Sequence, residues 1–207
     1  MPDNSTVHVI DDDEAARESL AFLLRSAKMD VRSYESAEDF LENLSGLAIG
    51  CIVTDVRMPG MSGIDLLRKL RDIDVRMPVI VITGHGDVPL AVEAMRIGAL
   101  DFLEKPYDDE ALIASVQNAL GAGEKINAES REKAHLLDRL ATLSSRERDV
   151  LEGLVAGQPN KIIAFNLGIS PRTVEIYRAN VMTKMKAGSL SELVRMALIS
   201  GLTPAAK

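Results

Sequence analysis

The feature that most constrains this chain is the alternation, five times between residues 7 and 120, of a short apolar segment with a segment of helical spacing. Strand-like segments rich in apolar residues occupy 7–10, 51–54, 78–82 and 100–103, and residues 31–34 read as an edge strand. Amphipathic segments follow at 15–28, from 36, at 64–70, 87–97 and 108–120. Short strands alternating with helices form a parallel sheet covered on both faces. We therefore predict an α/β fold with a doubly wound, five-stranded parallel sheet.

Polar residues stand at the ends of four of these strands. Asp11 and Asp12 follow the first strand, Asp55 ends the third, and Thr83 and Lys105 end or follow the fourth and fifth. Right-handed crossovers bring these ends to one edge, where open α/β sheets bind ligands. Crowded carboxylates repel each other unless a cation joins them, and hard oxygen ligands suit Mg²⁺. Each residue alone also fits a cap or turn. Together they predict a magnesium-assisted pocket in which a carboxylate accepts a phosphoryl group.

The strings V-I-D-D-D, V-T-D-V-R-M-P-G-M-S-G, V-I-T-G-H-G-D and D-F-L-E-K-P make residues 6–121 resemble a bacterial response-regulator receiver domain, whose sheet is flavodoxin-like. The resemblance implies a sensor histidine kinase as partner and a homodimer through residues 87–121 when phosphorylated. It also implies a cis peptide between Lys105 and Pro106. The implied site comprises the phosphoacceptor Asp55, Mg²⁺ ligands Asp11, Asp12, Asp55 and the Arg57 backbone carbonyl, and the switch or phosphate-binding residues Thr83, Phe102 and Lys105.

The charge distribution divides the chain near residue 123. Residues 1–123 carry 11 Lys and Arg against 22 Asp and Glu, a net charge of −11, whereas residues 124–207 carry 13 against 9, a net of +4. This asymmetry indicates two domains with different partners. Gly121 and Gly123 are expected to break the preceding helix. We predict a first domain at 1–123, a linker at 124–142 that reads as a helix, and a second domain at 143–207.

Four short helices are expected in the second domain from their cap signals. Ser144 and Glu147 form a capping-box pattern, Gly168 closes the second helix, and Pro171 suits the first turn of the third. Ser189 repeats the capping-box pattern before a fourth helix. The second and third helices are joined by a three-residue turn, which is the spacing of a helix-turn-helix. The domain is therefore predicted to be all-α, with four helices.

The third helix, 171–186, has an apolar stripe at Val174, Tyr177, Val181 and Met185 and a net charge of +3. Its opposite face would meet base edges in the major groove, and flanking cations would meet phosphates. A basic, solvated surface or a protein-docking unit would explain the same pattern. The candidate DNA-binding residues are Lys161, Arg172, Thr173, Glu175, Ile176, Arg178, Ala179 and Lys184.

Residues 143–202 resemble the LuxR-type (NarL-type) DNA-binding domain through L-S-S-R-E-R-D-V-L, G-Q-P-N-K-I-I-A and I-S-P-R-T-V-E-I-Y-R-A-N-V-M-T-K-M. Together the two resemblances imply a transcriptional activator of two-component signalling. Its partners would be the kinase, a double-stranded DNA promoter site and RNA polymerase.

Other classes of protein are less favoured by the sequence. One cysteine, Cys51, excludes a disulfide framework within one chain, and no apolar run is long enough to span a membrane. The start has no signal-peptide pattern, so a cytoplasmic location is expected. The rival enzyme class is a phosphatase of the haloacid-dehalogenase type, which would use Asp55 as its nucleophile and carry a second Asp two residues on as general acid. Arg57 stands at that position, so we expect no enzyme turnover beyond slow self-dephosphorylation. A regulator whose second domain binds only protein is the remaining alternative.

Overall fold

The computed structural model describes residues 5–44, 49–84 and 88–202. The chain divides into two compact units, Met1–Ala128 and Glu129–Lys207, which we describe separately. Asp87, where the sequence predicts the start of the fourth helix, lies outside the described residues. No helix in the described ranges is long and apolar enough to cross a membrane.

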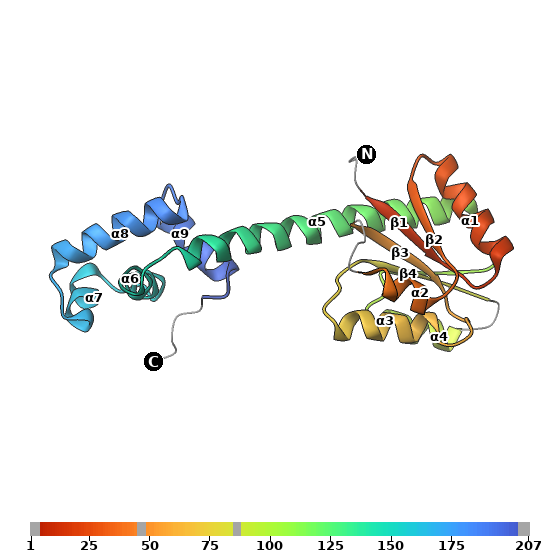
Figure 1. Cartoon of the computed structure of the whole chain (residues 1–207), viewed down its shortest axis with the longest axis horizontal. Coiled ribbons are helices and arrows are strands. Elements are labelled where there is room, and N and C mark those ends of the chain that lie inside the picture. The colour runs from red at the N-terminus through yellow and green to blue at the C-terminus, as the bar shows by residue number, and fades with distance from the viewer. Residues whose placement is uncertain (1–4, 45–48, 85–87, 203–207) are drawn as a thin grey trace. The chain divides into compact units, whose positions relative to one another are not determined.

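The first unit is built on a five-stranded parallel sheet (Figure 1), as the alternating sequence pattern predicts. The strand order is β2-β1-β3-β4-β5, so the direction of winding reverses between β1 and β3. In a doubly wound sheet this reversal opens a crevice beyond the carboxyl ends of the two strands. The strands are β1 (Thr6–Ile10), β2 (Asp30–Tyr34), β3 (Gly50–Asp55), β4 (Val79–Thr83) and β5 (Asp101–Glu104).

Helices cover both faces of this sheet, because the strands are apolar on both sides. One core joins strand residues such as Val9 and Val53 to α1 (Glu14–Ser26) and α5 (Asp109–Ala141). The other joins Ile10, Ile52 and Val81 to helices on the opposite face, α2 (Ala37–Glu42), α3 (Gly63–Asp72) and α4 (Val88–Ile97). Burial of both faces fixes the strand ends, and therefore the polar residues that follow them.

The predicted helix break at Gly121–Gly123 is wrong: α5 continues through both glycines to Ala141. Gly123 is a contact residue, because a Cβ added there would lie 2.7 Å from the backbone oxygen of Gly50 and 3.4 Å from Cδ of Pro78. A Cβ added at Gly121 would meet nothing within 4 Å. The helix thus keeps a glycine where it approaches the sheet closely, and packing outweighs the low helix propensity of the residue.

The second unit is all-α, as predicted. The end of α5 joins α6 (Ser145–Val155), α7 (Asn160–Leu167), α8 (Pro171–Met185) and α9 (Leu190–Ile199) around one core. Val174, Val181 and Met185 of α8 are fully buried in it, and Tyr177 is partly buried against it, so the predicted stripe is confirmed.

Two of the predicted caps differ in outcome. The capping box at Ser144 and Glu147 is present, with both reciprocal hydrogen bonds. At Ser189 only one half forms: its side chain accepts from the Glu192 backbone N–H, but the Glu192 carboxylate accepts from the backbone N–H of Gly188 instead. The second capping box is therefore wrong, although α9 begins where it was expected.

Candidate phosphoacceptor site and nucleic-acid interface

The first candidate site lies where the winding of the sheet reverses. Asp11 follows β1 and Asp55 ends β3, and these two strands pair directly in the sheet. Both carboxylates are nearly inaccessible, with side-chain exposures of 6% and 11%. Adjacent parallel strands thus deliver two buried acids to one place, which requires a compensating positive charge.

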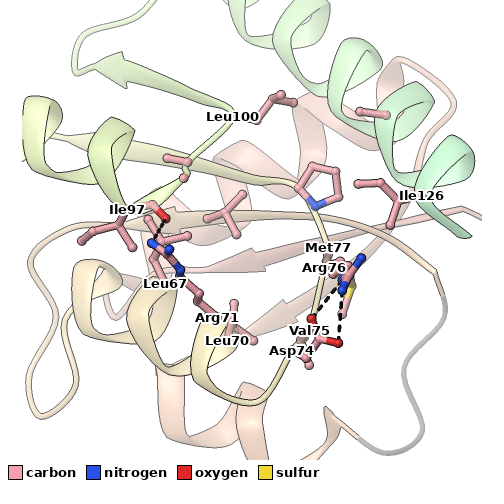
Figure 2. A pocket seen from close by; sticks show the side chains of 15 residues that line it. Leu67, Leu70, Arg71, Asp74, Val75, Arg76, Met77, Ile97, Leu100 and Ile126 are labelled. Atoms are coloured by element: carbon pink, nitrogen blue, oxygen red, sulfur yellow. Dashed lines mark hydrogen bonds and ion pairs between the residues drawn. The ribbon is translucent and has the colours of Figure 1, made fainter. Parts of the chain in front are cut away.

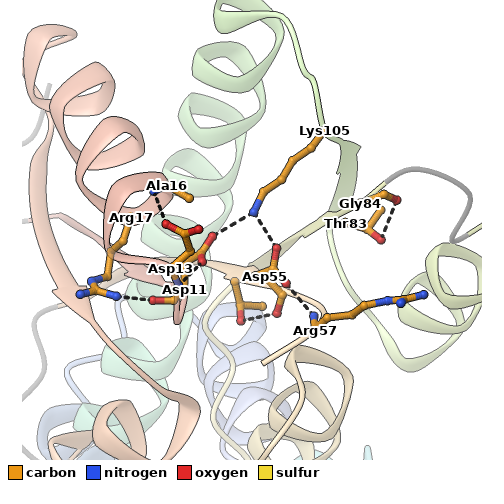
Figure 3. Close-up of polar contacts among 10 residues, drawn as sticks. Asp11, Asp13, Ala16, Arg17, Asp55, Arg57, Thr83, Gly84 and Lys105 are labelled. Carbon is orange, nitrogen blue, oxygen red and sulfur yellow. Dashed lines mark hydrogen bonds and ion pairs between the residues drawn. The ribbon is translucent and has the colours of Figure 1, made fainter. Parts of the chain in front are cut away.

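Lys105 provides that charge from just beyond β5 (Figure 3). Its Nζ donates to Oδ2 of Asp11 at 3.0 Å and to Oδ1 of Asp55 at 2.7 Å. Burial lowers the pKa of Lys105, but its hydrogen bonds to Asp55 and Asp11 and their charges outweigh burial, and the net shift is upward. The ammonium group is therefore held charged between the two acids. The peptide bond between Lys105 and Pro106 is cis, as predicted.

Backbone and arginine donors orient the other atoms of the two acids. The N–H of Arg57 donates to Oδ2 of Asp55 at 2.6 Å, and the N–H of Asp13 donates to Oδ1 of Asp11 at 2.9 Å. The Arg17 guanidinium donates to the backbone oxygen of Asp11 at 2.6 Å. No local signal in the sequence distinguishes Arg17 from a solvated arginine on a helix, so its contact with Asp11 is not predictable from the sequence.

Asp12 and Asp13 stand outside the buried pair in the described structure. Both are exposed, and the Asp13 side chain caps α1 by accepting from the backbone N–H of Ala16. Backbone hydrogen bonds from Ala16 and Ala15 lower the pKa of Asp13. Among the residues described, no three acidic, histidine or cysteine side chains gather closely enough to form a metal cluster. The negative charges of Asp11 and Asp55 repel each other, and the ammonium group of Lys105 lies between them, where a metal cation would otherwise bind.

The donor set nevertheless fits Mg²⁺. Two carboxylates already converge on a single cationic atom, and Asp12 and the Arg57 carbonyl lie on the segments next to them. Oxygen donors of this kind are what Mg²⁺ prefers, usually with several waters retained. A divalent ion would take the place of Lys105 on one or both carboxylates.

The predicted switch residues occupy the neighbouring strands. Thr83 ends β4, is 1% exposed, and its hydroxyl donates to the backbone oxygen of Gly84 at 3.4 Å. Phe102 pairs in register with Val81 and is half-buried. The backbone N–H of Lys105 donates to the oxygen of Thr83 at 2.8 Å. Thr83 and Lys105 therefore share one hydrogen-bonded strand end.

A groove of about 460 Å³ is a separate feature of this unit (Figure 2). It lies around the start of β4 and is lined by apolar side chains that include Leu67, Met77 and Ile126. Arg76 pairs with Asp74 at its rim, at 2.9 Å. None of the predicted site residues lines it.

The second candidate site is the outer face of α8. Arg172, Glu175, Ile176 and Ala179 are all exposed, Thr173 and Arg178 are half-buried, and Lys161 is exposed on α7. Ser170 caps the helix by accepting from the backbone N–H of Thr173, and Pro171 occupies its first turn. α8 thus presents Arg172, Glu175, Ile176 and Ala179 on the side opposite its buried stripe, and Thr173 and Arg178 flank that stripe.

Lys184 differs from the other predicted phosphate contacts. Its Nζ donates to Oε2 of Glu147 at 2.6 Å and to the backbone oxygen of Thr142 at 3.2 Å. Hydrogen bonds from Lys184 and from the Ser144 backbone lower the pKa of the buried Glu147 to about 2. Lys184 therefore neutralises an acid inside the unit. The sequence gives no sign of this pairing, because the two residues lie 37 positions apart.

The first unit has two acids and a lysine where the winding of its parallel sheet reverses, which is the arrangement of a receiver-type domain. The second unit contains a helix-turn-helix of the kind found in DNA-binding proteins. Together they define a class of two-domain regulators. Residues 7–117 match the family described as response regulator receiver domain, and residues 141–197 match the bacterial regulatory proteins of the luxR family. The chain belongs to the response regulators, with a LuxR-type second domain.

Known relatives are similar over nearly the whole chain. The transcriptional regulatory protein FixJ of Azorhizobium caulinodans is 60% identical over 205 residues, covering 99% of this chain and 97% of that protein. The crystal structure of full-length FixJ from B. japonicum is 52% identical, with a TM-score of 0.59 and coverage of 96% and 98%. The structure of response regulator StyR is 39% identical, with a TM-score of 0.81 and coverage of 94% and 98%.

Proposed function

We propose that this two-component response regulator is a transcriptional activator switched by transfer of a phosphoryl group from a sensor histidine kinase to Asp55. Its similarity to FixJ suggests control of nitrogen-fixation genes in response to oxygen. The DNA target would place its action in the cytoplasm. The observation that carries the proposal is the buried Asp55 carboxylate, held by Lys105 at 2.7 Å, in a chain that also has a helix-turn-helix.

The geometry prepares Asp55 as a nucleophile. The Arg57 N–H and the Lys105 ammonium hold its two oxygens in fixed positions. An Asp55 oxygen forms a bond to phosphorus as the phosphorus–nitrogen bond of the donor phosphohistidine breaks, and the leaving imidazole keeps that electron pair and takes up a proton. Lys105 then stabilises negative charge on the transferred group. Asp11, Asp12, Asp55 and the Arg57 carbonyl would hold Mg²⁺, which supplies further charge neutralisation.

Phosphorylation of Asp55 would change the conformation of the rest of the domain through Thr83 and Phe102. The Thr83 hydroxyl donates to the oxygen of Gly84 at 3.4 Å in the described structure, and a charged phosphoryl oxygen would be a stronger acceptor than that neutral carbonyl. Movement of Thr83 would let half-buried Phe102 repack and bias residues 87–121 toward a homodimer. Two joined recognition helices would cover two half-sites of a promoter and bring RNA polymerase to it.

We further propose that the chain is not an enzyme with turnover. Position 57, which would carry the general acid of a phosphatase acting through Asp55, is an exposed arginine. Such a chain loses its phosphoryl group slowly to water. An assay with small phosphate esters should give a single acyl phosphate per chain and then phosphate release no faster than self-dephosphorylation, and turnover faster than that loss would contradict this proposal.

The test of the switch is a DNA-shift assay with and without a small phosphodonor. Wild type should bind promoter DNA more tightly with the donor, and Asp55→Asn should not respond. Asp72→Asn is the matched control, since this aspartate is exposed at the end of α3, and it should behave as wild type. Equal binding by wild type and Asp55→Asn under both conditions would refute the switch.

The alternative in which the second unit binds only protein is tested separately. Phosphate contacts make the affinity for DNA fall steeply with salt, at a slope of about −0.9 for each phosphate neutralised. Removing the half-buried Arg178 with Arg178→Ala should weaken binding and flatten that slope. Unchanged affinity and no salt dependence would favour a protein partner.

A further inference from the structure

The exposed face of α8 carries an unusual sequence for a surface meant to meet a polyanion. We define its outer row as Arg172, Glu175, Ile176, Ala179 and Thr183, which follow one another at helical spacing and are all exposed. The row begins with a cation, but its centre consists of a carboxylate, an isoleucine and an alanine. Contact with phosphates alone does not explain these three residues.

Glu175 has no structural role in the second unit. No hydrogen bond or ion pair engages its side chain in the described part of the chain, although Arg172 and Arg178 lie three residues before and after it. Facing DNA, an unpaired carboxylate is repelled by phosphates unless it meets a donor. In the major groove only the amino groups of cytosine and adenine are donors. On adenine the amino group stands beside the acceptor N7, which repels the second carboxylate oxygen, so cytosine is the better partner.

Ile176 is also largely open to solvent. It is 56% exposed, although it neighbours a helix face that buries Val174 completely. Water is a poor environment for this much apolar surface, and the one apolar group that base edges offer in the major groove is the methyl of thymine. Ala179 follows three residues later and leaves space on the same side for the bases to approach.

We propose that Glu175 and Ile176 are specificity-determining residues, which read a cytosine amino group and a thymine methyl on neighbouring base pairs. The two side chains are adjacent on the helix, so they reach neighbouring positions of one half-site. This inference rests on the proposed DNA-binding function. It adds that the row selects by base chemistry, whereas the surrounding cations supply affinity without selecting a sequence.

The experiment begins with full-length protein treated with a small phosphodonor and a pool of random duplexes. Duplexes enriched by wild type are resynthesised with deoxyuridine in place of each thymidine in turn, which removes only the methyl. At one position per half-site the substitution should weaken wild-type binding about fourfold, the loss for one buried methyl group. Ile176→Ala should bind the thymidine and deoxyuridine duplexes equally at that position.

A matched control uses another exposed apolar residue of the same unit. Leu198 on α9 is 51% exposed and is not part of α8. Leu198→Ala should keep the wild-type response to deoxyuridine. The inference for Ile176 is overturned if no deoxyuridine position weakens wild type, or if Ile176→Ala keeps the same response.

The carboxylate is tested by two opposite effects. Exchange of one C·G pair per half-site for T·A should weaken wild type about fivefold or more, and Glu175→Ala should lose this discrimination. Because the repulsion from phosphates is gone, Glu175→Ala should also bind random DNA more tightly than wild type. Glu152→Ala, at an exposed glutamate of α6, should retain the discrimination.

The outcomes separate the inference from the function beneath it. If wild type enriches no duplex, DNA binding itself is refuted, and base reading falls with it. If duplexes are enriched but Glu175→Ala discriminates as wild type does, DNA binding stands and the role of Glu175 is overturned. Stronger binding of random DNA together with lost discrimination is a result that a purely structural role for Glu175 does not produce.

Discussion

Lys184→Met separates two roles that the lysine could have, support of the second unit or contact with DNA phosphates. Methionine keeps the length of the apolar stem and removes the charge. In the structure the ammonium is 2.6 Å from Oε2 of Glu147, whose side chain is 5% exposed, while the Lys184 side chain is 39% exposed. The substitution therefore leaves a buried carboxylate that keeps only its hydrogen bonds to Ser144.

The magnitude follows from the pKa of Glu147. Its shift from 4.5 to about 2 has Lys184 as its largest cause and the Ser144 backbone second. The whole shift corresponds to roughly 3 kcal/mol of stabilisation. Part of this belongs to the hydrogen bonds from Ser144, and the partial exposure of Lys184 screens the share that belongs to the lysine. We expect Lys184→Met to destabilise the second unit by about 1–1.5 kcal/mol at neutral pH.

Hydrogen exchange in the full chain measures this loss where it occurs. Amides of α6 and α8 should exchange about tenfold faster in Lys184→Met, since that free energy corresponds to about one power of ten. The pH dependence has a defined sign: a carboxylate with a lowered pKa stabilises the fold above its unfolded pKa of about 4.5, and this is lost as the pH falls toward 2. The part of this loss of stability at low pH that depends on Lys184 should be absent in Lys184→Met.

Lys161→Met is the control, because Lys161 is exposed on α7. It should leave exchange unchanged and make the salt slope of DNA binding shallower by about 0.9. Lys184→Met should do the reverse, with faster exchange and the wild-type salt slope. If Lys184→Met flattens the slope and leaves exchange unchanged, the assignment of this lysine to internal support is refuted.

Two further predictions concern the first unit. Gly123→Ala should destabilise it by about 1–3 kcal/mol, because the new Cβ would lie 2.7 Å from the Gly50 oxygen, whereas Gly121→Ala meets nothing and should stabilise the helix by about 0.5–1 kcal/mol. The stabilities of the two variants are measured by urea unfolding of the full chain and, separately, by hydrogen exchange in β3 and α5. Equal effects of the two substitutions would contradict the packing argument. Lys105→Met should bind Mg²⁺ more tightly than wild type, because the ammonium no longer competes for Asp11 and Asp55. Tighter binding should appear in a calorimetric Mg²⁺ titration, while phosphorylation by a small donor becomes slower. Unchanged Mg²⁺ affinity would show that the lysine does not compete.

The sheet was predictable because its signals are local. Most strands are short segments rich in apolar residues with a polar residue at or just beyond their end, and the topology that brings Asp11 and Asp55 together follows from right-handed crossovers. The capping box at Ser144 was predictable for the same reason, since both partners lie within one turn. Features of this kind depend on residues close together in the sequence.

The errors occur where a distant contact outweighs a local preference. Gly123 resembles a helix breaker until Gly50 and Pro78 are placed against it. The pairing of Lys184 with Glu147 also rests on a distant contact that the sequence does not signal, and the contact of Lys184 with DNA phosphates stays a prediction. At Ser189 the local pattern predicts a capping box, but the carboxylate of Glu192 bonds to the preceding glycine. Propensity and spacing give no information about such competing partners.

The ion pair between Lys184 and Glu147 also affects how the protein would distribute between its promoter and other DNA sequences. Residues 171–186 contain four lysines and arginines, and one of them, Lys184, is neutralised by Glu147. Near physiological salt each lost phosphate contact lowers the affinity for arbitrary DNA about fivefold. A bacterial genome offers millions of competing sites, so weaker hold on them leaves more molecules free to find a promoter. Withdrawing one cation into the fold would also lower the affinity for the promoter by the same factor, so the preference for the promoter is left to the residues that read bases.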